Sequence, residues 1–125
     1  MKNVIHTNSA PAAVGPYSQA IDCGSLVFLS GQIPLVPATG VLAPGGIVEQ
    51  TRQMMANIAA VLEKAGMSFE NVVKTTVFMT DLQDFTTFNE IYAEYFPKNP
   101  PARSCVQVAE LPKGALVECE CVCVK

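Results

Sequence analysis

Two stretches of the chain place apolar residues every three to four positions, as one face of a helix requires. The first runs from Ile47 to Ala65 and stops at Gly66, a residue suited to a helix C-cap. The second runs from Asp84 to Tyr95, and either Asp81 or Asp84 can cap it. Their apolar stripes comprise Ile47, Met54, Met55, Ile58, Val61, Leu62 and Ala65 in the first helix, and Phe85, Phe88, Ile91, Tyr92 and Tyr95 in the second. The methionines are interpreted as core residues.

Six further segments are extended by their alternation of apolar and polar residues or by their β-branched content. They are residues 3–7, 16–22, 26–30, 72–79, 102–108 and 115–124. The stretch 32–46 holds three prolines and three glycines, which predicts a surface loop. The resulting order, β-β-β-α-β-α-β-β, predicts an α+β fold in which two helices cover one face of a sheet. The other face must meet solvent or a partner, and the apolar composition favours a partner.

The last two strands are predicted to form a hairpin, because a tight turn at Leu111-Pro112-Lys113-Gly114 separates them. With an unbulged turn, residue 110 pairs with residue 115, and this register sorts the side chains onto two faces. The polar face comprises Arg103, Cys105, Gln107, Glu118 and Glu120, and the apolar face Val106, Val108, Val117, Cys119 and Cys121. The register is preferred because it keeps all the charge on one side.

Composition narrows the classes of function. The chain has 125 residues, which we treat as one domain spanning 1–125, with a net charge of −3 and a pI near 5.0. An acidic chain with scattered lysines and arginines argues against nucleic-acid binding. No apolar run approaches the ~18 residues of a membrane span, and the first seven residues lack a secretory core, so a cytoplasmic location is expected. Only 15% of the residues are charged, which points to apolar surface buried between subunits.

Five cysteines cannot all pair in a closed disulfide framework. Cys119, Cys121 and Cys123 project from one face of one strand, where neighbours do not readily bridge, and are interpreted as small buried apolar residues. No CxxC pair is present and His6 is the single histidine, which argues against a metal site.

Arg103 is the leading candidate for ligand binding, since Pro100 and Pro101 hold the chain extended just before it. A guanidinium fork suits a carboxylate, which it grips through two parallel hydrogen bonds. Glu118 or Glu120 could hold a water and transfer a proton, and alternation alone does not distinguish them. Cys105 would be a nucleophile only with a depressed pKa, and His6 is the one imidazole that could activate it.

Four other residues are candidates for the walls of a site. Tyr17 could wall a pocket or donate a hydrogen bond, and Ser30 and Gly31 could offer backbone N–H groups to an oxyanion. Asn89 is a polar residue on the helix that leads to the proline pair. The motifs GxGxxG, GxxxxGK[ST], GxSxG and HExxH are absent, which argues against a nucleotide-dependent dehydrogenase, a P-loop enzyme, a serine hydrolase and a zinc protease.

Three motifs follow one another along the chain: Gly15-Pro16-Tyr17-Ser18-Gln19-Ala20, Ser30-Gly31-Gln32-Ile33-Pro34 and Asn99-Pro100-Pro101-Ala102-Arg103-Ser104-Cys105-Val106. Together they closely resemble the RidA family, also called YjgF and formerly L-PSP, over essentially the whole chain. The resemblance implies a chorismate-mutase-like α+β fold with a mixed sheet, assembled as a homotrimeric barrel with clefts between subunits. The cysteine-rich final strand departs from the family, whose members generally carry aliphatic residues there.

The activity that the resemblance implies is hydrolysis of reactive enamines and imines such as 2-aminoacrylate to 2-keto acids and ammonia, without a cofactor or metal. Arg103 matches the family's carboxylate-binding arginine, and Glu118 its acidic residue that positions or activates water. Tyr17, Ser30, Gly31, Asn89 and Cys105 match the other cleft residues. Two alternatives stand beside this: a trimer that binds small carboxylates such as 2-keto acids without turnover, and an endoribonuclease or translation inhibitor.

Overall fold

The fold was established from a computed structural model, which describes residues 2–125; Met1, part of the N-terminal stretch judged above, lies outside them. The strands are β1 (Asn3–Ile5), β2 (Ala20–Asp22), β3 (Leu26–Gln32), β4 (Val72–Met79), β5 (Ala102–Gln107) and β6 (Val117–Val124). The helices are α1 (Ile47–Lys64) and α2 (Phe85–Tyr95). The predicted order of elements is confirmed, and both helices begin and end within a residue of their predicted bounds.

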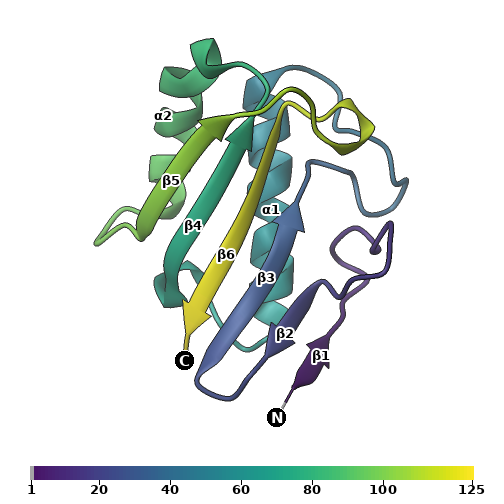
Figure 1. Cartoon of the computed structure of the whole chain (residues 1–125), viewed down its shortest axis with the longest axis vertical. Coiled ribbons are helices and arrows are strands. Elements are labelled where there is room, and N and C mark those ends of the chain that lie inside the picture. Colours follow the sequence, from purple (N-terminus) through teal and green to yellow (C-terminus); the bar gives the residue numbers. More distant parts are fainter. Residues whose placement is uncertain (1) are drawn as a thin grey trace.

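All six strands form one sheet in the order β1-β2-β3-β6-β4-β5, with α1 and α2 on one face (Figure 1). Every neighbouring pair is antiparallel except β4 and β5, which run parallel. The α+β class with a mixed sheet and one helical layer is therefore confirmed. Within residues 2–125, nothing forms a second layer on the face turned away from the helices.

The predicted closing hairpin is wrong. β4 lies between β5 and β6, and β5 pairs with β4 rather than with β6. The reason is the helix between β4 and β5: a helical crossover returns the chain parallel to the strand it left, and beside it. β6 then takes the remaining side of β4. The turn itself is present, since the Gly114 N–H donates to the Leu111 carbonyl at 3.2 Å, but it joins strands that are not neighbours.

The sorting of side chains onto two faces is also wrong. Arg103 lies opposite Thr75 on β4, and Thr75 lies opposite Cys121 on β6, so all three point toward the helices. Glu118 lies opposite Phe78, which pairs with Val106, so these point to the open face. Arg103 and Cys105 therefore share a face with Cys119 and Cys121, and Glu118 and Glu120 occupy the opposite one.

The core lies between the sheet and α1 and α2, as the apolar stripes predict. Met54, Met55, Ile58, Val61 and Leu62 are each at most 1% exposed, which confirms the methionines as core residues. Cys119, Cys121 and Cys123 fill the same core from β6 and are free thiols. Burial of these thiols costs little, because free cysteines behave as small apolar residues.

α1 also buries polar residues that the periodic pattern does not reveal. The Asn57 amide donates to the carbonyls of Ile33 and Leu35, at 3.1 and 2.9 Å, and the Gln50 side-chain oxygen accepts from the Leu116 N–H at 2.8 Å. These bonds tie the predicted loop 32–46, and the segment before β6, to the helix. Because both segments border the candidate site described below, α1 supports that site from behind.

The open face of the sheet carries exposed apolar residues as well as Glu118 and Glu120. Phe28 on β3 and Val106 on β5 are 44% and 45% exposed, and Leu26 and Val124 are exposed beside them. β3 is longer than predicted, since it continues past Ser30 through Gly31 to Gln32, with an irregularity in its pairing to β6. Exposed large apolar residues grouped on one sheet face are typical of a surface that another molecule covers.

Candidate functional site

The residues predicted for the site form two groups on opposite faces of the sheet. Arg103, Asn89 and Cys105 lie at the edge strand β5 and the neighbouring α2. Tyr17, Ser30, Gly31 and Glu118 line a cavity at the open face near β3 and β6. The structure of one chain therefore brings together the members of each group but does not bring Arg103 to Glu118.

Arg103 is held by α2. Its Nη1 donates to the Asn89 side-chain oxygen at 2.8 Å, and its guanidinium carbon lies 4.9 Å from the centre of the Tyr92 ring. The Phe85 and Phe88 rings are 5.4 and 5.8 Å away. These four residues come from successive turns of one helix face, so their spacing of three or four positions builds the arrangement. Cation–π attraction holds the charge in place here without an acidic partner.

No carboxylate within residues 2–125 forms an ion pair with Arg103; the pairs found there are Arg52 with Glu94 and Lys125 with Asp22. A half-buried guanidinium bound by one amide oxygen keeps further N–H donors for a ligand. Such a group is well suited to a planar carboxylate.

Cys105 lies beside Arg103 but is a poor nucleophile in this chain. Burial raises the pKa of its thiol, an effect that the nearby Arg103 charge opposes but does not cancel. His6 follows β1, at the opposite edge of the sheet from β5, and contacts Asn8. The thiol is therefore protonated at neutral pH and has no imidazole beside it, which argues against covalent catalysis by Cys105.

The second group encloses a cavity of about 350 Å³. Its lining residues are Val14, Tyr17, Ser30, Gly31, Ile33, Pro112, Glu118 and Glu120. Burial raises the pKa of the Glu118 carboxyl, and the like charge of Glu120 raises it further. A raised pKa makes a carboxylate a stronger base, and Glu118 is less exposed than Glu120, so Glu118 is the better candidate of the two acids for proton transfer.

The Ser30–Gly31 irregularity of β3 makes room for Glu118. A Cβ on Gly31 would overlap the Glu118 carboxyl group, whose Cδ would lie 2.8 Å from it. Gly31 is therefore required for the carboxyl to lie where it does. The expectation that Ser30 offers its backbone N–H to an oxyanion is wrong, because that N–H donates to the Gln19 carbonyl at 3.0 Å, while the Ser30 hydroxyl donates to the Ser18 carbonyl at 2.6 Å.

Tyr17 stands on the rim of the cavity and is 45% exposed. Its hydroxyl oxygen accepts a hydrogen bond from the Val14 N–H at 3.2 Å. The segment that carries it is held by Gln19, whose buried amide bonds the Thr7 backbone and the Pro11 carbonyl. Sequence reasoning missed Gln19 as a support; its place in the Gly15–Ala20 motif, directly before β2, was the available signal.

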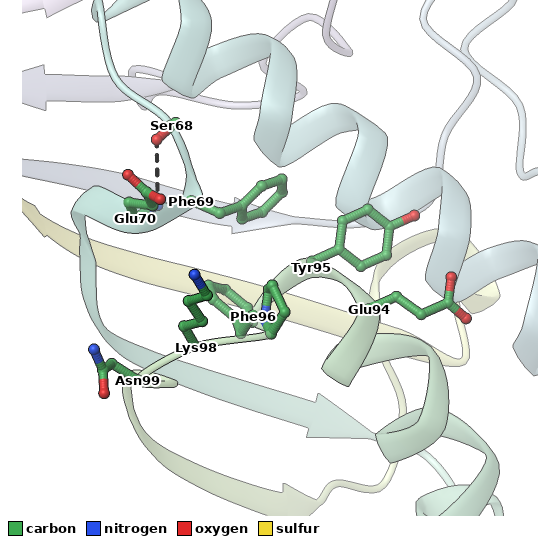
Figure 2. A pocket seen from close by; sticks show the side chains of 9 residues that line it. Ser68, Phe69, Glu70, Glu94, Tyr95, Phe96, Lys98 and Asn99 are labelled. Atoms are coloured by element: carbon green, nitrogen blue, oxygen red, sulfur yellow. Dashed lines mark hydrogen bonds between the residues drawn. The ribbon is translucent and has the colours of Figure 1, made fainter.

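A larger hollow of about 700 Å³ lies elsewhere, between the turn before β4 and the end of α2 (Figure 2). Its lining residues are Ser68, Phe69, Glu70, Glu94, Tyr95, Phe96, Pro97, Lys98 and Asn99. Glu94 is already paired with Arg52, and the Ser68 hydroxyl accepts from the Glu70 N–H. None of the residues predicted for the site lines this hollow. We therefore place the candidate site at Arg103 and at the Glu118 cavity, despite their smaller volume.

Residues 2–125 contain no group of three histidine, cysteine, aspartate or glutamate side chains placed to hold a metal ion. Within the same range, no helix combines the length and apolar character needed to cross a membrane.

The fold and the two groups of side chains define a small α+β protein with an arginine and an acidic cavity on opposite faces of one sheet. The profile of the family described as "Endoribonuclease L-PSP" matches residues 7–125. The chain therefore belongs to this family, known also as RidA or YjgF.

Individual relatives agree. The 2-iminobutanoate/2-iminopropanoate deaminase of Mus musculus is 49% identical over 125 residues, which cover 100% of this chain and 93% of that protein. The Rid-family protein YyfA of Yersinia pestis has a TM-score of 0.97 at 49% identity, with all of both chains covered. The crystal structure of TdcF from E. coli with bound serine has a TM-score of 0.94 at 46% identity, covering 98% of each chain.

Proposed function

We propose that this protein is an enamine/imine deaminase that hydrolyses small 2-imino acids, such as the imine formed from 2-aminoacrylate, to 2-keto acids and ammonia. The observation that carries the proposal is the half-buried Arg103 guanidinium, free of any ion pair within residues 2–125 and oriented by Asn89 and aromatic rings. The names of the mouse and bovine relatives, at 49% and 46% identity, support the reaction. The serine bound to TdcF supports a small carboxylate ligand.

Each group has a role in the proposed reaction. Arg103 binds the carboxylate, which places the neighbouring C=N carbon at a fixed point. Glu118 takes a proton from water as its oxygen attacks that carbon, and returns a proton to the nitrogen. The hydroxyl of the resulting carbinolamine then gives up its proton, which passes through Glu118 to the nitrogen. The C=O bond forms as the C–N bond breaks, and ammonia leaves. An enamine first becomes the imine by gaining a proton at its terminal carbon and losing one from its nitrogen. Imines are already electrophilic, so these parts suffice.

The two groups meet only if subunits assemble. Because Arg103 and Glu118 point to opposite faces of one sheet, a joint site needs Arg103 of one chain and Glu118 of another. The open face, with Phe28 and Val106 exposed, supports such an assembly. We therefore propose a homotrimer with three clefts between subunits.

The proposal is tested by a coupled assay. A dehydratase generates 2-aminoacrylate, and 2-keto acid release is timed with wild type, Arg103→Ala or Glu118→Gln. We expect wild type to accelerate release. We expect Arg103→Ala to lose most of that acceleration, by about 100-fold or more, because a buried bidentate anchor is removed. Glu118→Gln should lose ~100-fold in kcat, since general acid–base catalysis is typically of that size.

The matched control is Lys113→Ala, which removes an exposed positive charge from the turn before β6. Its rate should equal that of wild type. If folded wild-type protein does not accelerate release of the 2-keto acid, the deaminase proposal is contradicted for this substrate.

Binding without turnover is the second candidate, favoured by the serine in TdcF. It requires that wild type bind a 2-keto acid but leave the release rate unchanged. Ribonuclease activity, which the family description names, fits less well, because the cavity carries two carboxylates that repel phosphate. Absence of salt-dependent RNA binding would exclude it.

A further inference from the structure

The Arg103 guanidinium rests on the face of Tyr92, which is the nearest of three rings around it. The guanidinium carbon lies 4.9 Å from the Tyr92 ring centre, against 5.4 Å for Phe85 and 5.8 Å for Phe88. Asn89 fixes Nη1 alone, through one hydrogen bond. One bond leaves the guanidinium free to rotate about it, so the plane of the fork depends on the surface beneath.

Tyr92 is itself fixed through its hydroxyl. The Tyr92 and Thr75 hydroxyl oxygens lie 2.8 Å apart in a buried hydrogen bond, with Thr75 1% and Tyr92 6% exposed. Thr75 is also the backbone partner of Arg103 across the β4–β5 pairing. The three residues thus form a closed triangle. Backbone pairing joins β4 to β5, the hydroxyl bond joins β4 to α2, and the cation–π contact joins α2 to β5.

The rest of the Tyr92 ring is packed against other aromatic residues. Its centre lies 5.4 Å from Phe88 and 4.8 Å from Phe96, and Phe96 meets Phe69 edge-on at 5.3 Å. Phe69 and Phe96 also line the larger hollow (Figure 2). Burial raises the pKa of Tyr92 to about 12, so its hydroxyl stays protonated at neutral pH and keeps its bond to Thr75. The platform beneath Arg103 therefore carries no titrating charge near pH 7.

We propose that Thr75 and Tyr92 are positioning residues for carboxylate binding: their hydrogen bond holds the Tyr92 ring, and the ring sets the plane of the Arg103 fork. Bidentate binding requires two N–H groups aligned with both carboxylate oxygens, so a tilt of the fork weakens it. An aromatic platform stabilises the cation without occupying its donors, as an acidic partner would. The inference rests on the proposed role of Arg103 as a carboxylate anchor.

The test removes the hydroxyl bond from either side. Thr75→Val and Tyr92→Phe each delete one hydroxyl and keep the volume or the ring, and Thr75→Ser keeps the hydroxyl. The Kd of pyruvate, the smallest 2-keto acid, is measured by calorimetry on the assembled protein, alongside kcat and KM for imine hydrolysis. We expect Kd and KM to rise about 2- to 10-fold in Thr75→Val and Tyr92→Phe, the range that corresponds to one hydrogen bond. We expect kcat to change less than about twofold, and Thr75→Ser to restore wild-type Kd.

The matched control is Phe69→Leu, which damages the far end of the same aromatic row but has no contact with Arg103. A purely structural effect would follow the loss of stability, measured by urea unfolding, and would appear equally in this control. A rise in Kd of the same size in Phe69→Leu would overturn the proposal. So would an unchanged Kd in both hydroxyl variants. If Thr75→Val fails to fold, Tyr92→Phe removes the same bond and decides the matter.

Failure of this inference is distinguishable from failure of the deaminase proposal. If wild type binds pyruvate but does not hydrolyse imines, the deaminase proposal is contradicted. The Kd values of the Thr75 and Tyr92 variants then still test the positioning role. If imines are hydrolysed and the KM is unchanged in the Thr75 and Tyr92 variants, the deaminase proposal stands and the positioning role is contradicted. Wild type that neither binds pyruvate nor hydrolyses imines contradicts both.

Discussion

At the scale of single residues, Glu118 has the environment that matters most for the proposed chemistry. Its carboxyl lies in a cavity over a glycine that leaves room for it, with a second acid two positions away on the same strand. Both burial and the Glu120 charge favour the protonated form. The residue proposed to transfer the proton therefore weakens the folded state at neutral pH.

We expect Glu118→Gln to stabilise the folded protein at pH 7. The pKa of Glu118 is higher in the folded state than its usual 4.5, so between the two values the folded state binds more protons than the unfolded one. Stability therefore falls as pH rises through that window. The gain should be at most about 1 kcal/mol, since the group is half-exposed and screened by solvent. It should vanish near pH 3, where both states are protonated.

Urea unfolding of wild type and Glu118→Gln at pH 3 and pH 7 measures this difference. Glu110→Gln, at an exposed position before the turn, is the control and should match wild type at both values. A variant that is less stable than wild type at pH 7 would contradict the assigned pKa direction.

At the scale of elements, α1 and α2 support different parts of the proposed site. α2 presents Tyr92, Asn89 and two phenylalanines to Arg103, and so builds one half of the site directly. No residue of α1 lines the Glu118 cavity, but α1 holds in place the loop that carries Ile33, one wall of that cavity. Asn57 is the key residue in that link, because its amide donates to two backbone carbonyls in a buried position.

We expect Asn57→Ala to lower the free energy of unfolding by about 2 to 3 kcal/mol, because two buried carbonyls lose their donors. Chemical denaturation measures the loss. Asn71→Ala is the matched control, since the Asn71 amide also donates to a backbone carbonyl, that of Val124 at 2.9 Å, but at an exposed site where water can replace it. Its loss should stay below ~1 kcal/mol. Equal losses in the two variants would mean that Asn57 does not act through buried bonds.

At the scale of the whole molecule, the sheet separates the two halves of the proposed site. A residue on the helical face at one edge strand cannot reach a cavity on the open face of the same sheet without unfolding it. Assembly of several chains is the simplest way to combine them, and the exposed apolar residues of the open face provide surface for it.

We expect mixed assemblies of two inactive variants to regain activity. Arg103→Ala and Glu118→Gln chains are refolded together in equal amounts, and hydrolysis is compared with each variant alone. If each cleft takes Arg103 from one chain and Glu118 from its neighbour, random mixing leaves about a quarter of the clefts with both native residues. Activity should then approach a quarter of wild type. Mixtures no more active than the separate variants would show that both residues act within one chain, contrary to the proposal.

The order of elements, the bounds of both helices and the burial of the β6 cysteines could all be predicted from the sequence, because each depends on local periodicity. A helical stripe or an alternating strand is defined by residues a few positions apart, and burial follows from the same pattern. The candidate residues could also be chosen from the sequence, Arg103 by its proline pair and Gly31 by its motif. The sequence could not show whether these residues form one site.

Whether the candidate residues lie together depends on the tertiary structure. The two-residue period of a strand says which residues share a side, but not which strand lies next to it or which side faces the helices. The crossover through α2 inserted β4 between β5 and β6 and turned Arg103 toward the helices, away from Glu118. The same packing set Tyr92 beneath Arg103 and bonded it to Thr75. The sequence by itself determined the elements and the apolar stripes of the helices through local periodicity. Long-range pairing decided which strand faces are buried and which side chains meet.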